Sequence, residues 1–159
     1  MDRPAHPFDH CVTKAISDPF KAHRMSSSPI GHIILVDDED DCNFITKLVL
    51  KKAGFQGKLS CFTSAQEALR SLQGGAVPDM MFVDINMPGL NGFELIEAAE
   101  SEGLLPNGST SVVMFSSSNR PSDLEKALSF RSVIGYVEKA LTVENYERMV
   151  ADHLRRINR

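Results

Sequence analysis

From Ile30 onward, short hydrophobic runs alternate with longer stretches in which hydrophobic residues recur every three or four positions. Short runs of this kind fit strands buried on both faces of a parallel sheet, and the longer spacing is typical of helices with one face against a core. The predicted strands are residues 32–36, 58–62, 79–84, 111–116 and 133–137.

A helix is expected after each run, and its hydrophobic positions mark one face. These positions are Phe44, Ile45, Leu48 and Val49; Ala68, Leu69 and Leu72; Phe93, Leu95, Ile96 and Ala99; Leu124, Ala127 and Leu128; and Tyr146, Met149, Val150, His153, Leu154 and Ile157.

Start and stop signals agree with these helices. Ser64 with Glu67 has the spacing of a capping box, and Gly74-Gly75 would end that helix. Pro121 suits a first helical turn, and Thr142 is the expected N-cap of the last helix. Five strand–helix pairs therefore predict an α/β fold, a doubly wound, five-stranded parallel sheet with five helices. In such sheets the site lies outside the carboxyl ends of the strands.

Residues 1–29 lack this alternation and contain four prolines and a run of three serines, so we interpret them as a flexible N-terminal leader. Residues 30–159 then form one domain, and Met25 is an alternative natural start. After the predicted sheet only one helix remains, which leaves no further segment for DNA binding and favours a stand-alone domain whose output is another protein.

Composition narrows the function classes. A net charge of −4 and an isoelectric point of about 5.7 argue against nucleic acid or an anionic membrane as a partner, and no hydrophobic run is long enough for a membrane helix. Cys11, Cys42 and Cys61 form no CxxC motif, which indicates a reducing cytoplasm and idle or buried thiols.

Polar residues follow the predicted strands at the edge where a site is expected. They are Asp37 to Asp41 after the first strand, Asp84 at the end of the third, Ser116 at the end of the fourth, and Lys139 after the fifth. Neither a GxGxxG nor a GxxxxGK[ST] loop occurs, which removes support for dinucleotide or P-loop binding.

Clustered carboxylates repel one another unless a cation lies between them, and hard oxygen ligands favour Mg²⁺ or Mn²⁺. A carboxylate beside such a metal, with a lysine and a serine opposite, has the chemistry of a phosphoryl acceptor, and Asp84 is the candidate nucleophile. Each residue alone has a plainer interpretation: acids at a helix N-terminus, a turn serine, or a surface lysine.

The segments ILVDDED, VDINMPGLNGFELI, VVMFSS and GYVEKAL, in this order, closely resemble the receiver domain of two-component response regulators, over residues 30 to about 157. The resemblance implies a flavodoxin-like receiver fold. It further implies the following roles: Asp84 as phosphoacceptor, Asp37 and Asp38 with Asp84 and the Asn86 carbonyl as Mg²⁺ ligands, Ser116 as switch hydroxyl, Lys139 as phosphoryl partner, and Tyr136 as switch aromatic.

One position departs from the family pattern. Ala140 stands where the family usually has proline after the lysine, and a cis bond before a non-proline residue is costly. We therefore expect a trans bond, with a different path into the last helix and an altered reach of Lys139.

The resemblance implies a single-domain response regulator that takes a phosphoryl group from a sensor histidine kinase or a histidine phosphotransfer protein. It would signal to an unidentified downstream protein or act as a phosphate sink. A homodimer is also allowed. No enzymatic activity is expected beyond self-catalysed phosphotransfer to Asp84 and autodephosphorylation. The alternative is a receiver-like module that binds partners without phosphorylation. A phosphatase of the haloacid dehalogenase type is disfavoured because Asn86 stands where that chemistry needs a second aspartate.

Overall fold

The computed structural model describes residues 29–159 apart from residues 107 and 118. Apart from Pro29, the predicted leader of residues 1–29 lies outside the described residues. The strands are β1 His32–Val36, β2 Lys58–Phe62, β3 Met80–Asp84, β4 Ser111–Ser116 and β5 Val133–Glu138. The helices are α3 Asp40–Lys52, α4 Ala65–Gln73, α5 Gly92–Ser101, α6 Pro121–Ser129 and α7 Val143–Ile157.

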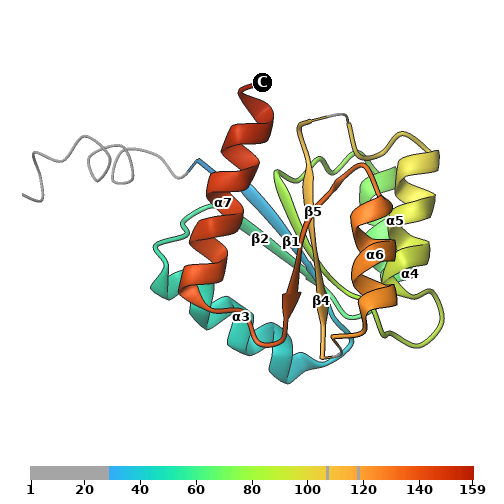
Figure 1. Cartoon of the computed structure of the whole chain (residues 1–159), viewed down its shortest axis with the longest axis horizontal. Helices are drawn as coiled ribbons and strands as arrows, with labels where there is room; N and C mark the ends of the chain where they lie inside the picture. The colour runs from blue at the N-terminus through green and yellow to red at the C-terminus, as the bar shows by residue number, and fades with distance from the viewer. Residues whose placement is uncertain (1–28, 107, 118) are drawn as a thin grey trace, which may run out of the picture.

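The five strands form one parallel sheet in the order β2-β1-β3-β4-β5. Helices α3 and α7 cover one face, and α4, α5 and α6 cover the other (Figure 1). This arrangement confirms the predicted doubly wound fold and the five strand–helix pairs. Among the described residues, no helix is both long and hydrophobic enough to cross a membrane.

Each face of the sheet has its own core. Val36 and Val83 pack with residues of α4, α5 and α6 on one side. Phe82 packs with residues of α3 and α7 on the other, and its ring lies 5.3 Å from that of Phe115 and 6.5 Å from that of Tyr146. Burial on both faces explains why β3 is hydrophobic without alternation until its last residue, Asp84.

The predicted N-cap hydrogen bonds of α4 and α7 are present. The Ser64 hydroxyl accepts a hydrogen bond from the Glu67 N–H, and the Thr142 hydroxyl accepts one from the Asn145 N–H. Pro121 begins α6. These caps fix where α4, α6 and α7 start relative to the strands that precede them.

Two helices orient their hydrophobic residues differently from the prediction. In α3 the buried residues are Asn43, Thr46 and Leu50. The residues that mark the expected face, Phe44, Ile45 and Leu48, are 61%, 44% and 52% exposed. In α6 only Ala127 is buried, while Leu124 and Leu128 are exposed. The cause in α3 is a polar anchor: the Asn43 side-chain amide donates to the main-chain carbonyl of Asp37, 2.9 Å away, and turns that side of the helix inward.

Candidate functional site

The candidate site lies at the carboxyl edge of the sheet. Asp37 directly follows β1, and Asp84 ends the neighbouring strand β3. Asp37 and Asp84 are only 4% and 3% exposed, whereas Asp38 is exposed. Each of the three residues offers one carboxylate oxygen, and these oxygens lie within 4.8 Å of one another. The structure therefore brings the three predicted acids together.

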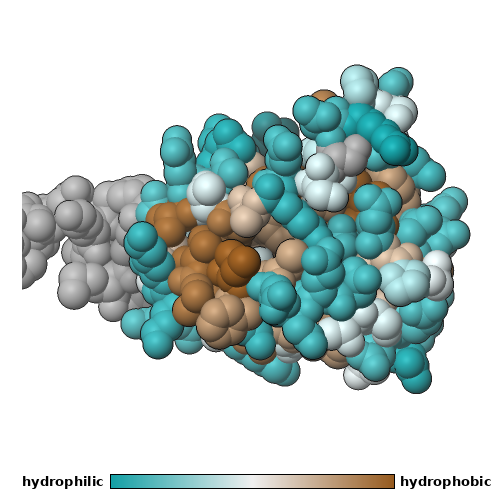
Figure 2. All heavy atoms as spheres, turned by 90° about the horizontal axis from the view of Figure 1, so that it is seen from below, coloured by the Kyte–Doolittle hydropathy of each residue, from teal (hydrophilic) through white to brown (hydrophobic). Residues whose placement is uncertain are grey.

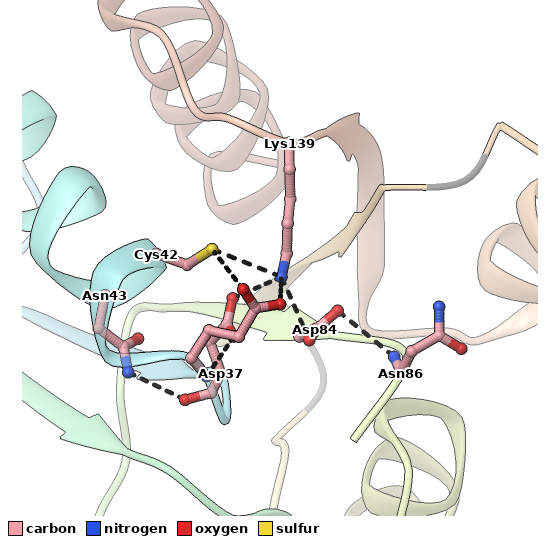
Figure 3. Close-up of polar contacts among 7 residues, drawn as sticks. Asp37, Cys42, Asn43, Asp84, Asn86 and Lys139 are labelled. Carbon is pink, nitrogen blue, oxygen red and sulfur yellow. Dashed lines mark hydrogen bonds and ion pairs between the residues drawn. The ribbon is translucent and has the colours of Figure 1, made fainter. Parts of the chain in front are cut away.

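Lys139 reaches this cluster from the end of β5. Its Nζ lies 2.8 Å from Asp37 Oδ2 and 3.2 Å from Asp84 Oδ2 (Figure 3). A longer contact of 3.8 Å joins Nζ to the Glu39 carboxylate. Burial lowers the pKa of Lys139, but the hydrogen bond to Asp37 and the charges of both aspartates outweigh it. The net pKa is above the ordinary value, so the side chain stays cationic.

Asp84 is an unusual carboxylate. Burial, and then the charge of Asp37, raise its pKa to about 6, although Lys139 and the Asn86 N–H act in the opposite direction. The Asn86 N–H donates to Asp84 Oδ1 over 3.3 Å. Two buried carboxylates thus face one ammonium group, and the site carries excess negative charge. A hard cation fits this set of oxygen donors, because it would offset the repulsion between the carboxylates of Asp37 and Asp84.

The chain around Asp37 is fixed by local hydrogen bonds. The Glu39 N–H donates to Asp37 Oδ1 over 2.9 Å, and the Asn43 amide holds the Asp37 carbonyl. Sequence reasoning missed Asn43, because a polar residue on the inner side of a helix gives no signal until the helix is oriented. It also missed Gly92, whose missing side chain lets α5 approach the main chain of Asp84: a Cβ at Gly92 would overlap the Asp84 carbonyl oxygen.

Ser116 lies at the same edge of the sheet as the acids, and Tyr136 lies on the neighbouring strand β5, opposite Met114 of β4. Ser116 is fully buried at the end of β4, next to β3. Its carbonyl accepts a hydrogen bond of 2.9 Å from the Lys139 N–H, which ties the end of β4 to the lysine. Tyr136 is half-buried and packs against the core on the α4–α6 side of the sheet.

The bond between Lys139 and Ala140 is cis, so the expected trans bond was wrong. The chain is held on both sides of this bond. Lys139 is fixed by Ser116 and the two aspartates, and Leu141 is buried in the core beside α7. Lys139 contacts both aspartates although alanine stands in place of the usual proline.

Cys42 is a further neighbour that the sequence did not indicate. Its Sγ lies 3.9 Å from Lys139 Nζ and 3.7 Å from the Glu39 carboxylate. Burial, and then the charge of Asp37, raise the pKa of Cys42, which favours the neutral thiol. Cys42 therefore forms part of the wall of the site on the α3 side.

The arrangement suits nucleophilic chemistry on a phosphoryl group. Asp84 presents a carboxylate at the tip of a buried strand, Lys139 lies opposite to balance developing negative charge, and the three acids can hold a hard cation. Asn86 lies two residues after Asp84 and is exposed, and its side chain cannot act as a carboxylic acid.

Comparison with known proteins gives a consistent result. Residues 33–151 match the family described as "Response regulator receiver domain". The chain is 31% identical over 124 residues to the nitrate/nitrite response regulator protein NarL of Escherichia coli, with 76% of this chain and 53% of that protein covered. It thus spans about half the length of this curated relative.

Solved structures are similar over most of the described residues. A two-component response regulator from Cytophaga hutchinsonii superposes with a TM-score of 0.75 and 30% identity, covering 80% of this chain and 99% of that one. A CheY-like receiver domain protein from Methanospirillum hungatei gives a TM-score of 0.65 and 25% identity, covering 81% and 98%.

Proposed function

The chain belongs to the response regulator receiver family of two-component systems, and from this premise we propose that Asp84 accepts a phosphoryl group from a histidine kinase or a histidine phosphotransfer protein. The observation that carries the proposal is the position of Lys139 Nζ, which lies between the carboxylates of Asp37 and Asp84. An ammonium group held there is placed to balance the charge of a phosphoryl group arriving at Asp84.

In the proposed step an Asp84 carboxylate oxygen attacks phosphorus, the phosphorus–nitrogen bond to the donor imidazole breaks, and the imidazole keeps the electron pair and takes up a proton. Asp37 and Asp38, with Asp84 and the Asn86 carbonyl, would hold Mg²⁺, or Mn²⁺ in its place, and the bound ion supplies positive charge to the phosphoryl oxygens. Lys139 binds one of those oxygens, and Ser116 donates a hydrogen bond to another. Hydrolysis of the aspartyl phosphate at the same site would return the domain to its starting state.

Phosphorylation adds charge and acceptor oxygens next to Ser116. We expect the Ser116 hydroxyl and Tyr136 to move toward the phosphoryl group and to change the surface formed by α6, β5 and α7. A downstream protein that prefers one surface would read the change, because a partner that binds both states equally shifts nothing. The same site would also allow the domain to act as a phosphate sink. We place the protein in the cytoplasm, where histidine kinases present their phosphoryl groups.

The proposal is tested by intact mass spectrometry after incubation with acetyl phosphate, with Mg²⁺ or with EDTA. The expected result is a Mg²⁺-dependent gain of one phosphoryl mass in the wild type and none in Asp84→Asn. Asp79→Asn is the matched control, because Asp79 immediately precedes the opposite end of β3 and accepts hydrogen bonds from Gly31 and His32. If neither acetyl phosphate nor a phosphorylated histidine phosphotransfer protein labels the wild type, the phosphorylation-independent module is the better description.

The role of Ser116 needs a separate test. Ser116→Ala should still be phosphorylated on Asp84, but the phosphorylated form should lose the change in the amide signals of α6 and α7 that the wild type shows by nuclear magnetic resonance. A full wild-type response in Ser116→Ala would exclude the proposed switch without touching the assignment of Asp84.

A further inference from the structure

Helix α3 presents a hydrophobic surface that the fold does not use. Phe44, Ile45 and Leu48 are 61%, 44% and 52% exposed, while the opposite side of α3 packs on the sheet through Leu50. They lie at positions i, i+1 and i+4 and therefore share one side of the helix. Figure 2, which views the molecule from the side on which α3 lies, shows hydrophobic residues gathered into a patch surrounded by hydrophilic ones.

The charges on the two ends of this surface have opposite signs. Asp40 and Asp41 are exposed in the first turn of α3, and Lys51 and Lys52 are exposed in the last. Residues 41, 45, 48 and 52 are spaced by four, three and four positions and form a single stripe that runs from acid through hydrophobic to base. Acids in the first turn and lysines in the last turn also complement the dipole of α3 itself. The stripe could therefore serve the stability of the helix or a contact with a partner, and an experiment can separate the two.

We propose that this stripe is the contact between two copies of the chain, with α3 of one copy packed antiparallel against α3 of the other about a twofold axis. An antiparallel pair places the acidic first turn of each helix against the basic last turn of the other. Ile45 of each copy then lies opposite Leu48 of the other. A twofold contact requires one surface to be complementary to itself, and a sequence with opposite charges at its two ends meets this requirement. A parallel pair would instead place like charges together.

The surface continues beyond the end of α3. A groove of about 270 Å³ lies between the end of α3 and the first half of α7, and its lining includes Ala53, Phe55 and Val150. The second copy would cover part of this groove. Stable dimers commonly bury about 1,200–2,000 Å² in total, and one helix pair with the rim of a groove is at or below that range. We therefore expect a weak dimer that depends on protein concentration.

The dimer would also adjoin the phosphoacceptor site. Cys42 belongs to the first turn of α3, and its Sγ lies 3.9 Å from Lys139 Nζ. A second copy along α3 would narrow the approach for a protein donor while leaving it open to acetyl phosphate. This consequence rests on the proposed function, whereas the dimer itself is measured without any phosphoryl donor.

The test is sedimentation velocity of the unphosphorylated full chain from about 10 µM to about 1 mM. Two charge-reversed variants are compared with the wild type: Asp40→Lys with Asp41→Lys, and Lys51→Glu with Lys52→Glu. Each variant carries one sign of charge along its stripe and should be monomeric alone. An equimolar mixture of the two should recover the dimer, because every contact then joins opposite charges. Leu48→Gln should weaken association at least tenfold without any change in charge.

Glu125→Lys on the exposed face of α6 is the control, and it should associate like the wild type. Circular dichroism melts identify any variant that fails to fold. If the variant with Asp40→Lys and Asp41→Lys does not fold, the variant with Lys51→Glu and Lys52→Glu still tests whether the charges on α3 are needed for association. A wild type that is monomeric at 1 mM overturns the proposal, as does loss of association in Glu125→Lys. Charge-reversed variants that fail to associate when mixed would overturn the antiparallel contact and leave the helix dipole as the role of these charges.

Discussion

Replacing Asp84 with asparagine should make the domain more stable at neutral pH in the absence of metal. Burial and the charge of Asp37 raise the pKa of Asp84 from an ordinary value of 3.8 to about 6. A carboxyl group with a raised pKa holds its proton more tightly in the folded state. Stability therefore falls as the pH rises from about 4 through 6, and the full loss is present above 6.

The size of the effect follows from those two pKa values. Their difference corresponds to about 3 kcal/mol in the free energy of unfolding, because each pH unit is worth about 1.4 kcal/mol. Asparagine has nearly the same shape and no charge, so it escapes this penalty, which already includes the opposing attraction of Lys139. We expect a net gain of about 1–3 kcal/mol for Asp84→Asn at pH 7.5.

Urea unfolding at pH 7.5 and at pH 4.5, both in EDTA, measures this gain. The advantage of Asp84→Asn should shrink at the lower pH, where the wild-type carboxyl is protonated in the fold. Asp79→Asn should change the free energy of unfolding in the opposite direction. The Asp79 carboxylate accepts hydrogen bonds of 2.7 and 3.0 Å from the Gly31 and His32 N–H groups, and its loss should destabilise the domain by about 1–2 kcal/mol. An Asp84→Asn variant less stable than the wild type at pH 7.5 would refute the charge argument.

Three further predictions concern the support of the site and of the last helix. Gly92→Ala places a methyl group against the Asp84 carbonyl and should lower stability by about 1–3 kcal/mol and slow labelling by acetyl phosphate, measured by thermal melts and intact mass; unchanged values would contradict the tight packing of α5 on β3. Asn91→Ala removes the capping box with Glu94 and should cost about 1 kcal/mol in urea unfolding, with Asn145→Ala at a half-buried position in the first turn of α7 as a comparison. His153 is 1% exposed and hydrogen-bonded to Ser111, and burial lowers its pKa. The neutral imidazole therefore contributes stability above the unfolded pKa of about 6.5, and this contribution is lost as the pH falls below that value. Relative to His153→Gln, the wild type should lose up to about 1.4 kcal/mol per pH unit below that value, and parallel stability curves between pH 8 and 5 would contradict this.

The sheet could be predicted from the sequence because strands buried on both faces must be hydrophobic throughout. The run that ends in Asp84 shows this directly. Its first four residues are hydrophobic because they are buried, and the carboxylate at its end is the exception that marks the site. The acids and the lysine could be placed together because they follow or end strands that are parallel, and parallel strands bring their carboxyl ends to one edge of the sheet.

The rotation of α3 could not be predicted. Its hydrophobic residues indicated one face, but the Asn43 amide bonds to the Asp37 carbonyl and Thr46 is buried, so Phe44 and Leu48 face outward. A hydrogen bond to a main-chain carbonyl across a loop leaves no periodic pattern in the sequence. The cis bond before Ala140 was also not predicted, because an alanine in place of proline favours the trans form and gives no local signal for cis.

The position of β5 at the edge of the sheet has a consequence for local unfolding. Among the described strands β5 pairs with β4 alone. Strands β1 and β3 pair with each other inside the sheet, and Asp37 directly follows β1 while Asp84 ends β3. A partial opening that releases β5 and α7 would withdraw Lys139 and leave the two aspartates in place. Native-state hydrogen exchange of the β5 amides would then report the fraction of molecules in which the acceptor lacks its ammonium group, separately from global unfolding.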